Sequence, residues 1–243
     1  MKESSRWFSE RVQQETQLVR WGAVGTPVLV FPTAGGDAEE IERFLLIQAL
    51  APLLEAGRIK VYSVHSIAGA AWVSKRHSPV YCSRLQTLFD RYIYEEVVPA
   101  IRTDCASPDI EIVTAGASIG AFNALASLCR HPDVFSKAIC MSGTYDFEHW
   151  LEGQWNQDFY FSSPLHFVPN LEEGSGQLQL LRRRFVVLPT GQGAWEAPGE
   201  SWKVANALGA RGIPNRVDMW GSEWRHDWPT WREMLPRYLA EMA

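Results

Sequence analysis

Several common signals are missing from this sequence of 243 residues, and each absence narrows its function. No stretch approaches the ~20 consecutive apolar residues that a membrane-spanning helix needs. The opening stretch, MKESSRWFSERVQQE, has no apolar core like that of a secretory signal. The four cysteines form no CxxC pair, which is typical of free thiols in a reducing compartment. We therefore expect a cytoplasmic protein without a membrane span.

Binding motifs for phosphates, nucleic acids and metals are also missing. The formal net charge is −5 and the basic residues form no stripe, so nucleic acid is not an expected partner. No G-x-G-x-x-G follows a strand pattern, and no Gly-Lys-Ser/Thr sequence occurs. The histidines show neither H-x-x-x-H nor H-E-x-x-H spacing. We expect no metal ion and no cofactor, and a small molecule as the partner.

What the chain does contain is a regular alternation of strand and helix patterns. Apolar runs of strand length occur at residues 27–32, 58–64, 109–114, 137–141, 184–188 and 215–220. Helical patterns fall between and after them, at residues 38–56, 83–103, 121–129, 200–209 and 228–242. Residues 7–21 fit one or two edge strands, and residues 67–82 fit a loop. This alternation predicts a mostly parallel sheet with helices on both faces, in a single α/β domain spanning residues 1–243.

The segment from 144 to 180 departs from this alternation. It has no clean period and carries many aromatic residues. We interpret it as a small lid or cap insertion rather than as a second domain. In parallel sheets, ligands bind outside the carboxyl ends of the strands, so the loops that follow the strands are the places to look for a site.

A serine between two glycines marks one of these loops. Gly116-Ala117-Ser118-Ile119-Gly120 lies between a strand pattern and a helix pattern, and it matches G-x-S-x-G. In that motif a sharp strand-to-helix turn lifts the serine hydroxyl clear of the backbone, and the small flanking residues let strand and helix approach closely. We predict that Ser118 is a nucleophile, and that the N–H of Ile119 donates to an oxyanion formed beside it.

A serine hydroxyl needs a base to take its proton. Of the six histidines, His226 follows the last predicted strand, where the base of such a sheet is expected. His65 ends an earlier strand, and His131 precedes a proline at the end of a helix and fits a structural role. We therefore predict that His226 is the base.

A carboxylate must then orient the imidazole and stabilise its cation. Glu196 is the first acid in the loop after the strand at 184–188, and the chain order serine, acid, histidine favours it. Asp146, one strand earlier, is the alternative acid. Glu200 and Asp227 also remain open.

The oxyanion needs a second donor. The loop Pro32-Thr33-Ala34-Gly35-Gly36 follows the first clear strand, and its glycines let backbone N–H groups face a ligand closely. We expect the donor to be the amide of Ala34 or Gly35.

Five segments between residues 28 and 239 resemble the α/β-hydrolase superfamily. More narrowly, they resemble the esterase family that includes the S-formylglutathione hydrolases (esterase D) and the antigen 85 mycolyltransferases. The segments are VLVFPTAGGDAEE, GASIGAFNALA, MSGTYDF, GQGAWE and HDWPTWREMLPRYL. The resemblance implies an α/β-hydrolase fold and assigns the nucleophile to Ser118, the base to His226 and oxyanion donation to Ile119.

The chain also departs from the pattern of these relatives. In esterase D relatives the acid sits in a Gly-x-x-Asp turn, whereas the turn that starts at Gly193 ends in Glu196, which keeps Asp146 open. Some formylglutathione hydrolases have a cysteine near the oxyanion loop, whereas this chain has none there. The resemblance therefore does not imply S-formylglutathione as the substrate.

Together these features predict a serine carboxylesterase that hydrolyses a small-molecule ester through an acyl-serine. Two alternatives remain at this point. One is an acyltransferase that passes the acyl group to an alcohol or thiol. The other is a hydrolase fold that binds without catalysing, because a fold does not fix a function.

Overall fold

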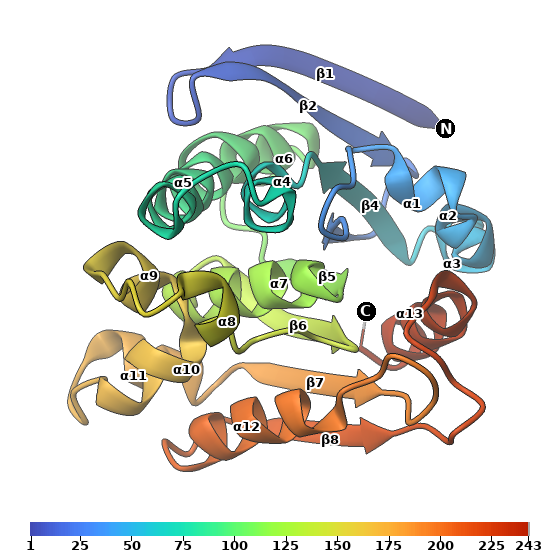
Figure 1. The fold of residues 1–243 in the computed structure, drawn as a ribbon. Coiled ribbons are helices and arrows are strands. Elements are labelled where there is room, and N and C mark those ends of the chain that lie inside the picture. Colours follow the sequence, from blue (N-terminus) through green and yellow to red (C-terminus); the bar gives the residue numbers. More distant parts are fainter. Residues whose placement is uncertain (243) are drawn as a thin grey trace.

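The protein is built on one eight-stranded sheet, seen in a computed structural model that describes residues 1–242 (Figure 1). The strands are β1 (Lys2–Ser9), β2 (Gln14–Trp21), β3 (Thr26–Phe31), β4 (Ile59–Val64), β5 (Ile112–Ala117), β6 (Phe135–Met141), β7 (Phe185–Thr190) and β8 (Asn215–Met219). Their order across the sheet is β1-β2-β4-β3-β5-β6-β7-β8. Strands β3 to β8 all run parallel to one another. Strands β1 and β2 form an antiparallel hairpin, and β2 pairs with β4 in antiparallel orientation.

The strand order places two loops side by side. Strand β3 lies between β4 and β5, so the chain changes direction across the sheet at this strand, and ligands bind at such a switch point. Phe31 at the end of β3 pairs in register with Gly116 near the end of β5. The loop after β3 therefore starts beside the turn that carries Ser118.

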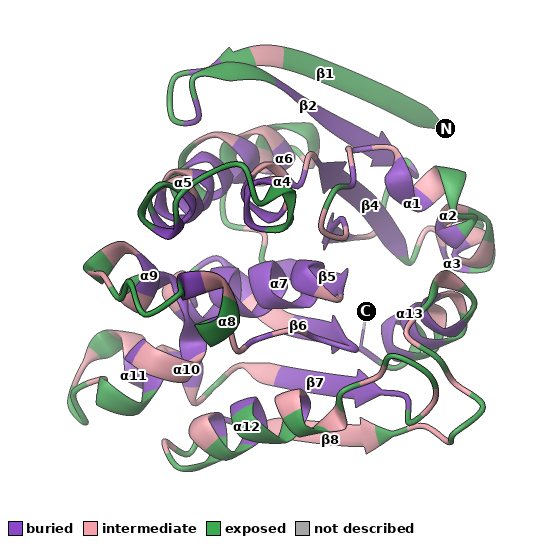
Figure 2. Ribbon diagram, in the orientation of Figure 1, coloured by how far each residue is buried: buried purple, intermediate pink, exposed green. Residues whose placement is uncertain are grey.

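Alternating residues of the central strands face two separate hydrophobic cores. On β3, Leu29 and Phe31 belong to one core, and Val28 and Val30 belong to the other. The first core is completed by the helices within residues 67–209, and the second by the helices within residues 40–55 and by the helix over residues 228–242. Figure 2 shows the central strands buried and much of β1 exposed at one edge, as expected for a two-sided parallel sheet.

The expected helix over residues 38–56 was wrong. The chain instead forms three short helices, α1 (Glu40–Arg43), α2 (Leu46–Ala49) and α3 (Ala51–Glu55). Leu45 adopts the left-handed conformation, with φ of 63°, and this ends α1. Leu46, Leu50 and Leu53 still face the second core, which explains the helical period in the sequence.

The expected loop over residues 67–82 was also wrong. It contains α4 (Ile67–Ser74) and the start of α5 (Pro79–Tyr92), whose Ser78 cap accepts a hydrogen bond from the Tyr81 amide. Helix α5 continues through a π-helical turn (Ile93–Val97) into α6 (Val98–Asp104). The remaining long helices are α7 (Ile119–Arg130), α12 (Pro198–Gly209) and α13 (Trp228–Met242). Among the described residues, no helix is long and apolar enough to cross a membrane.

The segment 144–180, predicted as a lid, forms short helices that pack on the first core. They are α8 (Glu148–Leu151), α9 (Gln157–Ser162), α10 (Pro164–Phe167), a 3₁₀ turn (Val168–Asn170) and α11 (Gly176–Leu181). Phe147 stacks on Phe122 of α7 with ring centroids 4.5 Å apart, and meets Trp72 of α4 edge-on at 5.3 Å. Phe159 packs against the same Trp72 at 5.8 Å. These aromatic contacts fasten the segment to α4 and α7.

Removing the ring of Phe147, at the centre of these aromatic contacts, should therefore destabilise the protein. We expect Phe147→Ala to lower the free energy of unfolding by about 3–5 kcal/mol, because a fully buried ring is lost and leaves a cavity. Phe161→Ala, in the same segment but 54% exposed, is the matched control and should cost far less. Urea unfolding followed by fluorescence measures both, and equal losses would contradict the packing described here.

Candidate active site

Ser118 occupies a strained turn between β5 and α7. Its backbone has φ of 57° and ψ of −124°, a region that L-residues rarely enter. A Cβ on Gly116 would lie 2.3 Å from the backbone of Gly120. A Cβ on Gly120 would lie 2.5 Å from the carbonyl oxygen of Phe31. The two glycines are thus required by backbone contacts closer than any side chain permits.

The turn is fixed by hydrogen bonds on both sides. The Ser118 amide donates to the carbonyl of Met141 at the end of β6 over 3.0 Å, and the Ser118 carbonyl accepts from the Thr144 amide over 3.2 Å. Ile119 is the first residue of α7, where helix N–H groups lack partners within the helix. Its amide therefore lies beside the serine at the positive end of the helix dipole.

His226 and Glu196 face each other across the loops that follow β7 and β8. Nδ1 of His226 lies 3.7 Å from Oε2 of Glu196, and the His226 amide donates to the carbonyl of Ala194 over 3.0 Å. The imidazole keeps 22% of its side-chain surface exposed, whereas the Glu196 side chain is 1% exposed. The carboxylate is thus buried behind a histidine that reaches solvent.

Two hydroxyl groups hold the buried carboxylate of Glu196, and an indole holds one of these hydroxyl groups. The hydroxyl of Ser142 donates to Oε1 over 2.6 Å, and that of Thr190 donates to Oε2 over 3.2 Å. Nε1 of Trp231 in α13 donates to the Ser142 oxygen over 3.1 Å, and the Trp231 ring meets His226 edge-on at 5.2 Å. A buried carboxylate needs such donors, because an unpaired buried charge is costly.

The loops after β7 and β8 also contact each other through their backbones. The Gly193 amide donates to the carbonyl of Trp224 over 2.8 Å, and a Cβ on Gly193 would lie 2.6 Å from that same oxygen. The Gln192 amide donates to the carbonyl of Gly221 over 3.2 Å. These contacts fix His226 relative to Glu196.

The other three candidate acids hold other groups. Asp146 forms an ion pair with Lys203, with Oδ2 and Nζ 2.8 Å apart. Glu200 accepts hydrogen bonds from the amides of Tyr145 and Asp146 over 2.9 and 2.7 Å. Asp227 accepts from the Trp228 amide at the start of α13 over 2.7 Å. Of the four carboxylates, Glu196 is the one that the structure places beside His226.

The loop after β3 forms a tight turn over Thr33–Gly36. The Gly36 amide donates to the Thr33 carbonyl over 3.1 Å, and within residues 1–242 the amides of Ala34 and Gly35 make no hydrogen bond. A Cβ on Gly69 of α4 would lie 3.2 Å from both the Ala34 carbonyl oxygen and Cγ2 of Ile119. The structure thus brings together the two backbone segments in which oxyanion donors were predicted.

Sequence reasoning missed the residues that support the site. Ser142 directly follows β6, and Thr190 is the last residue of β7. Both lie at the carboxyl edge of the sheet, and that position is a signal that could have found them. Glu40, which holds Thr33, and Trp231 carried no signal of their own. Among residues 1–242, no three His, Cys, Asp or Glu side chains gather as a metal site would require.

The sequence model of a family described as "Putative esterase" matches residues 65–242, most of the chain. The chain belongs to this esterase family. Membership makes the protein an ester hydrolase, which confirms the enzyme class predicted from the sequence. No curated protein matches the sequence.

Solved structures of low sequence identity share the fold of this esterase. A ferulic acid esterase is 14% identical with a TM-score of 0.74, over 98% of this chain and 96% of that one. An S-formylglutathione hydrolase from Agrobacterium tumefaciens is 13% identical with a TM-score of 0.72, over 99% and 95%. Mycobacterium tuberculosis MPT51 is 16% identical with a TM-score of 0.68, over 100% and 97%. The predicted α/β-hydrolase fold is confirmed.

The close backbone contact at the serine turn gives a direct test of this geometry. We expect Gly120→Ala to destabilise the esterase by about 2 kcal/mol or more, because its Cβ would overlap the Phe31 carbonyl. Gly199→Ala, also in a helix but with no atom within 4 Å of the added Cβ, should leave stability unchanged or slightly raised. Thermal unfolding of both variants is the measurement, and a tolerated Gly120→Ala would contradict the turn.

Proposed function

We propose that this esterase hydrolyses small-molecule carboxylic esters through an acyl-serine formed on Ser118. The observation that carries the proposal is the strained backbone of Ser118, because strain of this kind persists where it positions a reacting group. The buried Glu196 behind His226 supports it by giving the imidazole an orienting partner.

In the first half of the reaction, Oγ of Ser118 attacks the ester carbonyl carbon while His226 takes the hydroxyl proton. The carbonyl π-electron pair moves to oxygen, and the amide of Ile119 and that of Ala34 or Gly35 hold the resulting oxyanion. Glu196 stabilises the imidazolium. The oxyanion then collapses, the bond to the alcohol oxygen breaks, and His226 returns the proton to the leaving alcohol.

In the second half, water takes the place of the alcohol. His226, part of whose ring reaches solvent, takes a proton from this water as it attacks the acyl-serine. The second tetrahedral intermediate then collapses, the bond from the acyl carbon to Oγ of Ser118 breaks and releases the acid, and His226 returns the proton to Ser118. Within residues 1–242 the contacts of the His226 ring are with Glu196 and Trp231, and in unliganded hydrolases the hydrogen bond between serine and base often forms only when substrate binds.

Removal of the nucleophile tests the reaction. We expect Ser118→Ala to lower kcat/KM on a p-nitrophenyl acyl ester on the order of 10⁵-fold, because the acyl-enzyme can no longer form. Ser127→Ala, on the same helix α7, is the control and should retain activity. Full activity in Ser118→Ala would remove Ser118 from the mechanism. Acyl transfer to an added alcohol or thiol, in preference to hydrolysis, would instead assign the protein as a transferase.

The choice of acid has its own test. We expect Glu196→Gln to lower kcat on the order of 10³-fold or more, because the amide no longer stabilises the imidazolium. Asp146→Asn should lose far less, since Asp146 is paired with Lys203. Steady-state kinetics on the same ester compare the two variants. Equal losses, or a larger loss in Asp146→Asn, would overturn the assignment of Glu196.

A further inference from the structure

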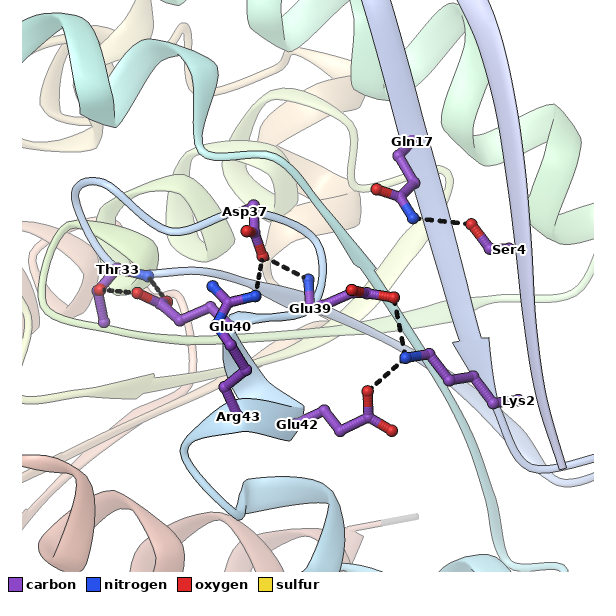
Figure 3. Close-up of polar contacts among 9 residues, drawn as sticks. All are labelled: Lys2, Ser4, Gln17, Thr33, Asp37, Glu39, Glu40, Glu42 and Arg43. Carbon is purple, nitrogen blue, oxygen red and sulfur yellow. Dashed lines mark hydrogen bonds and ion pairs between the residues drawn. The ribbon is translucent and has the colours of Figure 1, made fainter.

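A second buried carboxylate lies beneath the loop that follows β3. Glu40, the first residue of α1, is 6% exposed. Its Oε2 accepts from the Thr33 amide and its Oε1 accepts from the Thr33 hydroxyl, both over 2.7 Å (Figure 3). Burial raises the pKa of this carboxyl, and the bonds from Thr33 oppose that rise. One side chain thus fixes both the backbone and the side chain of Thr33.

The turn is shaped around this carboxylate. A Cβ on Gly36 would lie 2.3 Å from Oε2 of Glu40, so the carboxylate occupies the space that a side chain at residue 36 would need. The Gly36 carbonyl accepts from the Ser66 amide over 2.9 Å, and the Gly36 amide donates to the Thr33 carbonyl. Both ends of the turn are therefore bound to the protein. Ala34 and Gly35, at its tip, are the residues whose amides are left for a ligand.

The neighbouring acids on the same helical turn act differently. Glu39 and Glu42 both pair with Lys2 of β1, and their side chains are each 40% exposed (Figure 3). They join the edge hairpin to α1, and within residues 1–242 their side chains form no hydrogen bond or ion pair with the turn over Thr33–Gly36. Glu40 is the member of this acidic run that faces the site.

We propose that Glu40 is a positioning residue that holds the Thr33–Gly36 turn so that an amide at its tip meets the oxyanion. The inference rests on the proposed function. A donor stabilises a transition state only when it is already in place, within about 2.7–3.1 Å of the developing charge. Two hydrogen bonds to Thr33 restrict the residue that directly precedes Ala34. The side chain of Glu40 makes its hydrogen bonds to Thr33 and none to Ser118 within the described residues.

Kinetics of Glu40 variants test the inference. We expect Glu40→Ala to lower kcat about 10- to 100-fold with little change in KM. A turn amide that is held less firmly bonds the oxyanion more weakly, and the oxyanion develops only after the substrate has bound. The affinity for phenylboronic acid, whose boron becomes tetrahedral on the serine oxygen, should fall by a similar factor. Glu40→Gln should recover most of both values, because its amide can accept from the Thr33 amide and donate to the Thr33 oxygen. Glu42→Ala, on the same helix, is the matched control and should match the wild type.

A smaller change keeps the test decisive if Glu40→Ala does not fold. Thr33→Val removes only the hydroxyl bond, and we expect an intermediate loss of kcat and of boronate affinity at unchanged KM. Wild-type turnover and boronate affinity in Thr33→Val and in any folded Glu40→Ala would overturn the positioning role and leave a structural one. Failure of the proposed function is distinguishable, because Ser118→Ala would then retain the activity of the wild type.

Discussion

The structure depends on one close backbone contact, between the start of α7 and the ends of β3 and β5. Gly116 and Gly120 allow the helix to begin directly against the sheet, at distances where a Cβ would overlap backbone atoms. This contact forces Ser118 into its strained conformation and places the Ile119 amide beside it. It also sets the loop after β3 against the same helix start, because β3 and β5 are adjacent and in register. The turn that carries Ser118 and the predicted oxyanion loop therefore share one cause.

Two buried carboxylates support this arrangement from opposite sides. Glu196 is held by hydroxyl groups from the ends of β6 and β7 and lies behind His226. Glu40 is held by Thr33 and lies beneath the tip of the loop after β3. In both cases the cost of burying a carboxylate is offset by hydrogen bonds, and those bonds tie the carboxylate to a loop of the site.

Much of the fold and the main site candidates could be predicted from the sequence. Alternating apolar runs indicate strands wherever both faces of a sheet are buried, and the G-x-S-x-G motif reflects a backbone contact that only glycine permits. The broken helix over residues 38–56 could not be predicted, because Leu45 enters the left-handed region without a glycine to signal it. Glu40 could not be singled out from Glu39 and Glu42, since only the packed structure decides which of the three is buried.

Covalent labelling distinguishes a nucleophilic Ser118, activated by its surroundings, from an inert serine. A fluorophosphonate probe reacts with an activated serine at neutral pH, and peptide mass spectrometry locates the adduct. We expect one equivalent of label per folded chain, on the peptide that contains Ser118, and strongly reduced labelling in Glu196→Gln. Ester hydrolysis by a protein that is not labelled at Ser118, or is labelled at another residue, would contradict this expectation.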